Sequence, residues 1–332
     1  MSNTHHRRRR KPRWGRIALL TVFIIVAVFA GYRCLFRPPE QKQSEPGLPA
    51  AAGDVTLSEE EAAAAEALRS HLERKPDFYT ILVSGVDDHN GGSDTTSLVA
   101  VDAANDSIYG VSVPRDTKAV IDGKNHKINY AYNSGGIDLL SEVVSEQLGI
   151  PVDYTVQVDL QGFEALVNAI GGVNFYVPID MNYDDPIQNL SIHLSKGQQL
   201  LNGADALKVV RFRHNNDGTG YGSEDLGRMQ TQQNFLKAVA KQVLTVSNLN
   251  KIDDFVKIFQ SYVETDLTLG NLAWLGREAI GMGAEAIDFS TLPNEWKSPY
   301  IYLDQEATLA LVNEHLNPYV EDRVPEDLNI PS

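Results

Sequence analysis

Three arginines lie close together in the segment 208–233 of a chain whose net charge is −15. Arg211 and Arg213 are separated by one residue, so both side chains would lie on one side of an extended segment. Arg228 follows on a predicted helix. Guanidinium groups repel one another unless an anion lies between them, and the planar fork of arginine can bind two phosphate oxygens at once. The cluster therefore indicates a phosphate-binding site.

The helix that carries Arg228 is predicted to begin at Ser223 and to be long and amphipathic. Asp225, Arg228 and Gln232 follow a spacing of i, i+3 and i+7, so they share one face of it. Another interpretation stays open, in which the arginines are solvated or are paired with nearby carboxylates, namely Asp217, Glu224 and Asp225.

Two carboxylates flank a polar loop between predicted strands. Asp87 follows the strand 78–84, and Asp94 precedes the strand 97–101. Carboxylate oxygens are suitable ligands for Mg²⁺, and a bound ion can bridge phosphates. Asp87 and Asp94 are therefore candidate ligands of Mg²⁺, or of Mn²⁺. Taken singly, each aspartate is more typical of a turn than of a metal site.

Arg115 and Asp116 directly follow a third predicted strand, 107–113. Ligands of α/β folds bind outside the carboxyl ends of strands, so Arg115 joins the candidate phosphate site. A hydroxyl that attacks phosphorus must lose its proton, and a nearby carboxylate can take it. Asp116 and Asp225 are both candidates for this base, and the sequence does not choose between them.

Strand-like and helical segments alternate along the chain. The predicted strands are 78–84, 97–101, 107–113, 152–158, 173–177 and 287–292, and the main predicted helices are 127–148 (interrupted at Gly135-Gly136), 160–170, 204–207, 223–243, 252–262, 272–282 and 306–316. The acidic stretch 180–186 is predicted to be a loop. This alternation predicts an α/β fold, with one domain over 77–320 built on a central mixed sheet flanked by helices, and a short tail at 321–332.

Charge is unevenly distributed along the chain. Residues 1–16 hold seven Lys/Arg and no acid, which leaves 22 of the 29 basic residues with all 44 acidic residues in the rest. A body this acidic argues against nucleic-acid binding over a broad surface. A single cysteine, Cys34, excludes an internal disulfide, and the eight histidines show no HxxxH or HExxH spacing.

Residues 17–36 form an apolar run of twenty residues whose one charge, Arg33, lies near its end. The positive-inside rule predicts that residues 1–16 are cytoplasmic and that the chain after residue 37 is outside. The run is long for a cleaved signal peptide, and no A-x-A-like site follows it, so we expect an uncleaved, single-pass anchor in the cell membrane. A linker at 37–56 and a helix at 57–75 are predicted to lead into the domain.

An ordered series of short motifs extends over about residues 77–245. They are ILVSGVD at 81–87, SDT at 93–95, SVPRDT at 112–117, KINYAY at 127–132 with GG at 135–136, VDLQGFEALVNAIGGV at 158–173, KGQQLLNGADAL at 196–207, VRFR at 210–213 and DLGRMQTQQ at 225–233. In this order the motifs resemble those of the LytR-CpsA-Psr family, and by continuity the resemblance extends to about residue 320.

The resemblance implies a function outside the cell. Members of this family move a glycopolymer from a polyprenyl pyrophosphate carrier to peptidoglycan, and the bond they form is a phosphodiester. Wall teichoic acids and capsular polysaccharides are the usual cargo. By resemblance, Asp87 and Asp94 match metal-binding carboxylates. The residues that match a pyrophosphate-binding pocket are Arg115, Arg211, Arg213, Arg228 and Gln232, and we expect catalytic roles for Asp94, Arg115, Asp116 and Asp225.

Three places depart from the family pattern. Gly92-Ser93 stand where many members have an arginine before the SDT motif, Thr231 stands where many have a second arginine, and Asp88 lies near a position where some carry arginine. The pocket is therefore expected to be less positive than is usual for the family.

Two further functions remain open. One is a non-catalytic regulator or scaffold that binds polyprenyl phosphates, and the other is a lipid pyrophosphatase that uses water in place of a sugar hydroxyl. A lipid tail would also need an apolar slot. Phe163, Leu166 and Val167 are candidates for its lining, unless they are ordinary core residues.

Overall fold

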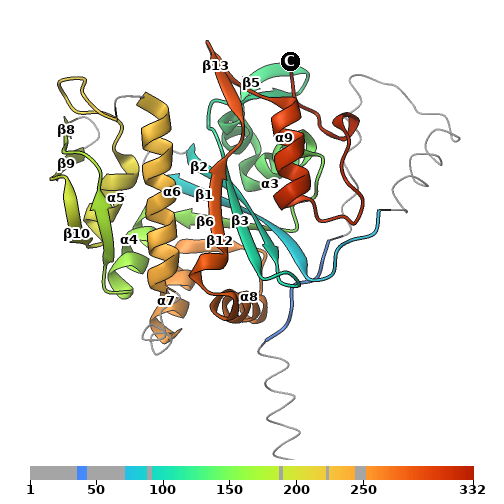
Figure 1. The fold of residues 1–332 in the computed structure, drawn as a ribbon, viewed down its shortest axis with the longest axis horizontal. Coiled ribbons are helices and arrows are strands. Elements are labelled where there is room, and N and C mark those ends of the chain that lie inside the picture. The colour runs from blue at the N-terminus through green and yellow to red at the C-terminus, as the bar shows by residue number, and fades with distance from the viewer. Residues whose placement is uncertain (1–35, 43–71, 88–91, 187–189, 222–223, 244–251) are drawn as a thin grey trace, which may run out of the picture.

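A six-stranded mixed sheet forms the centre of the protein (Figure 1). The computed structural model describes residues 36–42, 72–87, 92–186, 190–221, 224–243 and 252–332. The strand order of the sheet is β11-β6-β1-β2-β3-β12. These strands are β1 (Phe78–Asp87), β2 (Gly92–Asp102), β3 (Ser107–Val113), β6 (Tyr154–Asp159), β11 (Val263–Thr265) and β12 (Ile287–Thr291).

Four of these strands run in the same direction. β1 is parallel to β6 and β3 is parallel to β12, whereas β2 is antiparallel to both β1 and β3. The carboxyl ends of β1, β3, β6 and β12 therefore meet at one edge of the sheet, which we call the carboxyl edge. The opposite edge is the amino edge. Ligands of such sheets bind outside the carboxyl ends of the strands.

The two faces of the sheet are covered by different helices because side chains alternate across a strand. On one face, Leu82 and Leu98 are fully buried against α3 (Asn129–Leu148) and against α9 (Gln305–Leu311) with the π-helical turn Val312–Leu316 that continues it. On the other face, Ile81 packs near α8 (Leu269–Met282). Burial of each such side chain contributes roughly 1.5–3 kcal/mol.

A second apolar cluster lies beside the sheet. It is formed by α4 (Leu160–Ala169), α5 (Gly203–Arg211), α6 (Glu224–Val243) and the strand pairs β7 (Val173–Val177) with β10 (Gly197–Leu201) and β8 (Met181–Asp185) with β9 (Leu190–Leu194). Phe235 of α6 is fully buried in this cluster, and its ring centroid is 5.0 Å from that of Phe175. Helix α7 (Ile252–Tyr262) approaches α4 so closely that a Cβ on Gly162 would clash with Tyr262.

Two short antiparallel pairs follow the strands that end at the carboxyl edge. β4 (Lys118–Ile121) with β5 (Lys124–Lys127) comes after β3, and β13 (Asn294–Lys297) with β14 (Tyr300–Leu303) comes after β12. The amide of Ile301 donates a hydrogen bond to the carbonyl of Asp116 at 2.9 Å. The two pairs are thus joined beside the turn that carries Arg115.

The predicted α/β fold with a central mixed sheet is confirmed, and so is the break at Gly135-Gly136, where Gly136 has a φ of 69°. Such a positive φ is open to glycine at little steric cost. The prediction of a loop at 180–186 was wrong, because β8 occupies most of this stretch. Met181 is buried and pairs with Leu194 of β9, so apolar alternation outweighs the acidic composition of this stretch.

The predicted membrane run lies outside the described residues except for Phe36, and so do residues 1–16 and most of the predicted helix 57–75. At the end of that helix, residues 72–75 are not helical, and Arg74 instead forms a bridge with Tyr319. Within the described ranges no helix has the length and apolarity needed to cross a bilayer. The predicted tail packs on the domain, where the amide of Asn329 donates to the carbonyl of Glu146 at 3.2 Å.

Candidate functional site

The carboxyl edge brings together segments that are far apart in the sequence. Val86 of β1 pairs with Asp159 of β6, and Ser112 of β3 pairs with Thr291 of β12. Each parallel pair therefore ends nearly level at this edge, and β1 extends a little beyond β3. At this edge β3 and β12 each continue into a short connection, whereas β6 leads directly into helix α4. Residues at the ends of these strands therefore lie near one another.

The two candidate metal ligands lie on neighbouring strands at this edge. Asp87 is the last residue of β1, and Asp94 is near the start of β2. Asp94 is the extra residue of a β-bulge, since the pairing of β2 with β1 moves from Thr95 directly to Ser93. Both aspartates were expected outside the strands, in the connection between 78–84 and 97–101, and both are instead within the strands. A bulge re-aims a side chain and is frequent near functional sites. The side chains of these aspartates lie outside the described part of the chain.

Arg115 lies in a tight turn directly after β3. The backbone amide and the hydroxyl of Thr117 both donate to the carbonyl of Pro114, at 3.0 and 2.7 Å. The carbonyl of Arg115 accepts a hydrogen bond from the amide of Asn129 at 3.3 Å, and its side chain is exposed. The turn is therefore fixed by hydrogen bonds on both sides, while the guanidinium group reaches the surface.

The register of β2 and β3 brings Arg115 near Asp94. Thr96 of β2 lies opposite Val113 of β3, and the strands are antiparallel. Two residues further toward the carboxyl edge come Asp94 on one strand and Arg115 on the other. The backbone thus brings a candidate metal ligand and a candidate phosphate-binding arginine to adjacent positions.

Asp116 is engaged in an ion pair. Its carboxylate lies 3.0 Å from the ammonium group of Lys127, and both side chains are about one third exposed. This contact holds Asp116 toward the β4–β5 pair. The other candidate base, Asp225, lies in the first turn of α6, and its side chain is outside the described part of the chain.

Arg211 and Arg213 do not lie on one extended segment, so that prediction was wrong. Helix α5 was expected to end at Leu207 but continues through Arg211. Val209 is buried in the second apolar cluster, and this packing outweighs the weak helix propensity of the valines. Phe212 then leaves the helix with a ψ of 131° and is fully buried. Arg211 is half-buried on the last helical turn, whereas Arg213 is exposed after the buried Phe212.

Gln232 joins α6 to the end of α5. Its Nε2 donates a hydrogen bond to the carbonyl of Val210 at 2.9 Å. This carbonyl is one of the last four of α5, which lack partners within the helix. The side chain of Gln232 therefore stabilises the end of α5, one residue before Arg211. This structural role is separate from any contact with a substrate.

Helix α6 is also fixed along β12. The Nε2 atom of Gln233 donates to Thr291 Oγ1 at 3.0 Å, and Lys237 Nζ lies 2.6 Å from an oxygen of Asp288. The order of these contacts shows that α6 runs antiparallel to β12. Arg228 is five residues before Gln233, so it lies about 7.5 Å further along the helix axis, beyond the end of β12. The helix thus extends Arg228 past the carboxyl edge.

Arg228 lies near Tyr221. Burial raises the pKa of the Tyr221 phenol, and the hydroxyl of Thr231 and, to a smaller extent, the positive charge of Arg228 act in the opposite direction. The ring of Tyr221 packs against the ring of Phe212, with centroids 5.7 Å apart. A Cβ on Gly227 would also clash with Tyr221, so the first turns of α6, which carry Arg228, pack beside the segment between Arg211 and Arg213.

The structure thus gathers the elements that carry Arg115, Arg211 and Arg228 at or beside the carboxyl edge. Arg213 begins a loop that is held toward the β8–β9 pair, where the amide of Asn182 donates to the side chain of Asn215 at 2.6 Å. Convergence of all four guanidinium groups on one anion stays a prediction.

The three residues that were candidates for the lining of an apolar slot all pack in or against the second apolar cluster. Val167 is fully buried there, and Phe163 and Leu166 are half-buried against it. Thr231, at a position where many family members have arginine, is also buried, and its hydroxyl donates to the carbonyl of Gly227 at 2.8 Å.

The sequence did not single out Asp159, which ends β6 at the carboxyl edge. Its carboxylate accepts a hydrogen bond from the amide of Gln161 at 2.8 Å and so caps α4. A carboxylate between a predicted strand and a predicted helix was the available signal. In the described part of the chain, no group of three or more His, Cys, Asp or Glu side chains is arranged to hold a metal ion.

Comparison with known proteins identifies relatives. TagU of Bacillus cereus, a polyisoprenyl-teichoic acid–peptidoglycan teichoic acid transferase, is 36% identical over 199 residues, which are 58% of this chain and 62% of that protein. TagV of Bacillus subtilis, which has the same description, is 32% identical over 227 residues, 65% of this chain and 56% of that protein. The chain therefore matches less than two thirds of the length of these relatives.

Solved structures share the fold. The crystal structure of B. subtilis TagV has a TM-score of 0.60 and 29% identity, and the match covers 72% of this chain and 97% of that one. TagT bound to LI-WTA has a TM-score of 0.57 and 26% identity, covering 71% of this chain and 88% of that one. The model of the LytR_cpsA_psr family matches residues 50–317. This chain therefore belongs to the LytR-CpsA-Psr family.

Proposed function

We propose that this protein is a membrane-anchored, extracytoplasmic phosphotransferase. It moves an anionic or phosphate-linked glycopolymer from a polyprenyl pyrophosphate carrier to peptidoglycan and forms a phosphodiester. The observation that carries this proposal is the meeting of Asp87, Asp94 and Arg115 at the carboxyl edge with the α5–α6 junction beside it. The names of the relatives TagU and TagV, and the TagT complex with LI-WTA, support the same class of substrate.

The proposed reaction exchanges one phosphate ester partner for another. A sugar hydroxyl of peptidoglycan attacks the phosphorus that carries the glycopolymer. A new P–O bond forms, the bond to the bridging oxygen of the pyrophosphate breaks, and polyprenyl phosphate leaves. The hydroxyl proton passes to a carboxylate, either Asp116 or Asp225. Arginines offset the negative charge that shields the phosphorus and hold it in line with the attacking oxygen.

We propose that a divalent cation binds at this edge. Asp87 and Asp94 offer oxygen ligands from adjacent strands, and the bulge at Asp94 sets that residue apart from the regular pairing. Hard oxygen donors of this kind suit Mg²⁺ or Mn²⁺. When bound, such an ion neutralises phosphate charge. Arg115, next in register to Asp94, would then bind phosphate oxygens beside it.

The proposed topology is a cytoplasmic segment 1–16, a membrane span 17–36 and a catalytic body outside the cell. It is supported by the seven basic residues that precede the apolar run. Protease added to intact protoplasts should digest the body. Complete protection of the body would contradict both the topology and a role in wall assembly.

Transfer itself is tested with the full-length protein in lipid nanodiscs. It is incubated with Mg²⁺, a lipid-pyrophosphate-linked glycan and a peptidoglycan oligomer, and the products are separated by mass. Glycan attached to the oligomer is the expected result. Release of glycan phosphate without attachment would instead identify a pyrophosphatase, and an unchanged lipid that binds tightly would identify a scaffold.

A further inference from the structure

Residues 36–42 are docked on the domain at the amino edge of the sheet, and we call them the strap. The Nε2 atom of Gln41 donates to the carbonyls of Lys75 and Phe78, at 2.7 and 3.0 Å. The amide of Lys42 donates to Asp153 Oδ1 at 3.2 Å. Although these residues were predicted to be part of a linker, the described part of that segment is held by specific hydrogen bonds.

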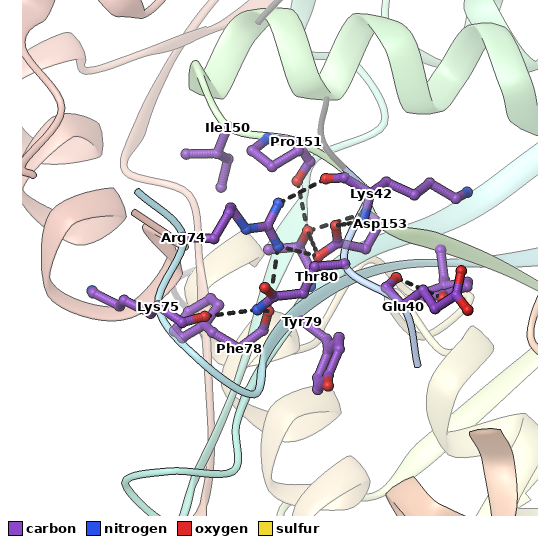
Figure 2. Close-up of polar contacts among 12 residues, drawn as sticks. Glu40, Lys42, Arg74, Lys75, Phe78, Tyr79, Thr80, Ile150, Pro151 and Asp153 are labelled. Carbon is purple, nitrogen blue, oxygen red and sulfur yellow. Dashed lines mark hydrogen bonds and ion pairs between the residues drawn. The ribbon is translucent and has the colours of Figure 1, made fainter. Parts of the chain in front are cut away.

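Asp153 is a buried centre for these contacts (Figure 2). Its other oxygen accepts hydrogen bonds from Arg74 Nη2 at 2.7 Å and from the amide of Thr80 at 2.9 Å. Arg74 also donates to the carbonyl of Lys42 at 3.1 Å, so it binds both the carboxylate and the strap. Figure 2 shows these side chains converging where the strap passes the start of β1.

The first residues of the strap lie on α8. The side-chain amide of Asn271 donates to the carbonyls of Arg37 and Pro38, both at 3.2 Å. The guanidinium carbon of Arg277 lies 5.8 Å from the centroid of the Phe36 ring. Further along, the hydroxyl of Tyr154 donates to the carbonyl of Glu40 at 2.7 Å. The strap is therefore fixed to the domain along most of its length.

Helix α8 has an apolar outer face beside the strap. Leu269, Ala273, Gly276 and Ile280 follow a spacing of i, i+4, i+7 and i+11, and Leu269 and Ile280 are 54% and 37% exposed. Trp274, on the inner side of the helix, packs edge-on against Tyr79 of β1, and the two ring centroids are 5.6 Å apart. The inner residues of α8 thus pack in the core, whereas its outer apolar residues Leu269 and Ile280 are exposed to solvent.

We propose that the outer face of α8, together with the strap, lies on the surface of the lipid bilayer. This inference rests on the proposed anchor, whose apolar run ends at Phe36. Each residue spans at most about 3.6 Å, so Pro38, bound to Asn271, is within about 7 Å of the end of that run. The stretch of chain between the bilayer and α8 is therefore too short to let α8 move far from the membrane surface. Apolar side chains with a flanking cation suit the boundary between lipid headgroups and acyl chains, and here that cation is Arg277, which also pairs with Glu278.

The test measures how close α8 lies to lipid in the full-length protein. In a Cys34→Ala background, Leu269→Cys or Ile280→Cys carries a fluorophore, and vesicles of phosphatidylglycerol and phosphatidylcholine contain a shallow nitroxide-labelled lipid. A matched label at Asn125→Cys, exposed on β5 at the other edge of the sheet, is the control. We expect quenching at positions 269 and 280 to exceed that at 125 several-fold. Equal quenching at all three positions would overturn the proposal.

Two further measurements separate the inference from the proposed function. Flotation with the vesicles reports the anchor itself, and a chain that does not float refutes the anchor and the orientation together. A chain that floats without quenching at position 269 refutes only the orientation. The triple variant Gln41→Ala/Tyr154→Phe/Asn271→Asp removes the strap contacts of these three side chains, while it keeps the Tyr154 ring and the residue 271 oxygen that accepts from Thr268. It should float as before and lose most of the difference in quenching; an unchanged difference would show that the strap does not hold α8 on the bilayer.

Discussion

Replacement of Arg74 by methionine should destabilise the protein far more than loss of an exposed ion pair. Asp153 is fully buried, and the Arg74 side chain is 11% exposed. Methionine fills similar space but leaves the carboxylate with hydrogen bonds from Thr80 and Lys42 and with no opposing charge. Removal of one partner of a buried pair costs about 3–5 kcal/mol.

That cost corresponds to a fall in Tm of roughly 10 °C, since 1 kcal/mol shifts the Tm of domains of 150–250 residues by about 2–4 °C. The assay is thermal unfolding of the purified protein, followed by circular dichroism. Lys241→Met is the matched control, because the ion pair of Lys241 with Glu285 is exposed on both sides. Little change in Tm is expected for it, since such pairs are weak.

The double variant Arg74→Met/Asp153→Asn distinguishes charge from packing. The neutral amide oxygen still accepts a hydrogen bond from Thr80, and no uncompensated charge remains. Part of the lost stability should return. If Arg74→Met lowers the Tm no more than Lys241→Met does, Asp153 is not held by Arg74 in the way described, and the reasoning fails.

Three further predictions concern the candidate site. Asp94→Ala should lower metal-dependent transfer by orders of magnitude with little change in Tm; a large loss of Tm would make Asp94 structural. Arg228→Lys keeps the charge and loses the planar fork, so binding of the lipid pyrophosphate, measured by calorimetry, should weaken about ten- to a hundred-fold, and unchanged affinity would remove Arg228 from the site. Gln232→Ala leaves the carbonyl of Val210 without its 2.9 Å partner, so the free energy of unfolding in urea should fall by about 1–3 kcal/mol; an unchanged value would mean that water replaces the amide.

The fold could be predicted from local patterns where one pattern dominated. The strand 107–113 and the helix 252–262 have the predicted bounds, because strand alternation and helical periodicity are strong there. The β8–β9 pair was not predicted, since its apolar alternation is short and lies among acidic residues. Such short strands gain their stability from the neighbours that they pack against, and those neighbours are distant in the sequence.

The sequence indicated candidate site residues, but it could not predict how the backbone arranges them. Asp94 was expected in a loop because the bulge depends on the pairing of β2 with β1, which no local pattern reports. The spacing of Arg211 and Arg213 was read as it would be in an extended segment, whereas burial of Val209 extends the helix through Arg211. The partner of Gln232 is 22 residues away and could be found only in the folded chain.

The length of β1, which has ten residues, fixes the distance between the two edges of the sheet. At about 3.3 Å per residue, the strand separates the strap at the amino edge from Asp87 at the carboxyl edge by roughly 30 Å. With α8 on the bilayer, a carrier whose pyrophosphate reaches Asp87 must withdraw part of its hydrocarbon tail from the membrane. Each methylene moved into water costs about 0.8 kcal/mol, so extraction over this length demands a continuous apolar path along the protein. Three half-buried side chains on the α8 side of the sheet would be the first part of that path, namely Val83, Val99 and Val156.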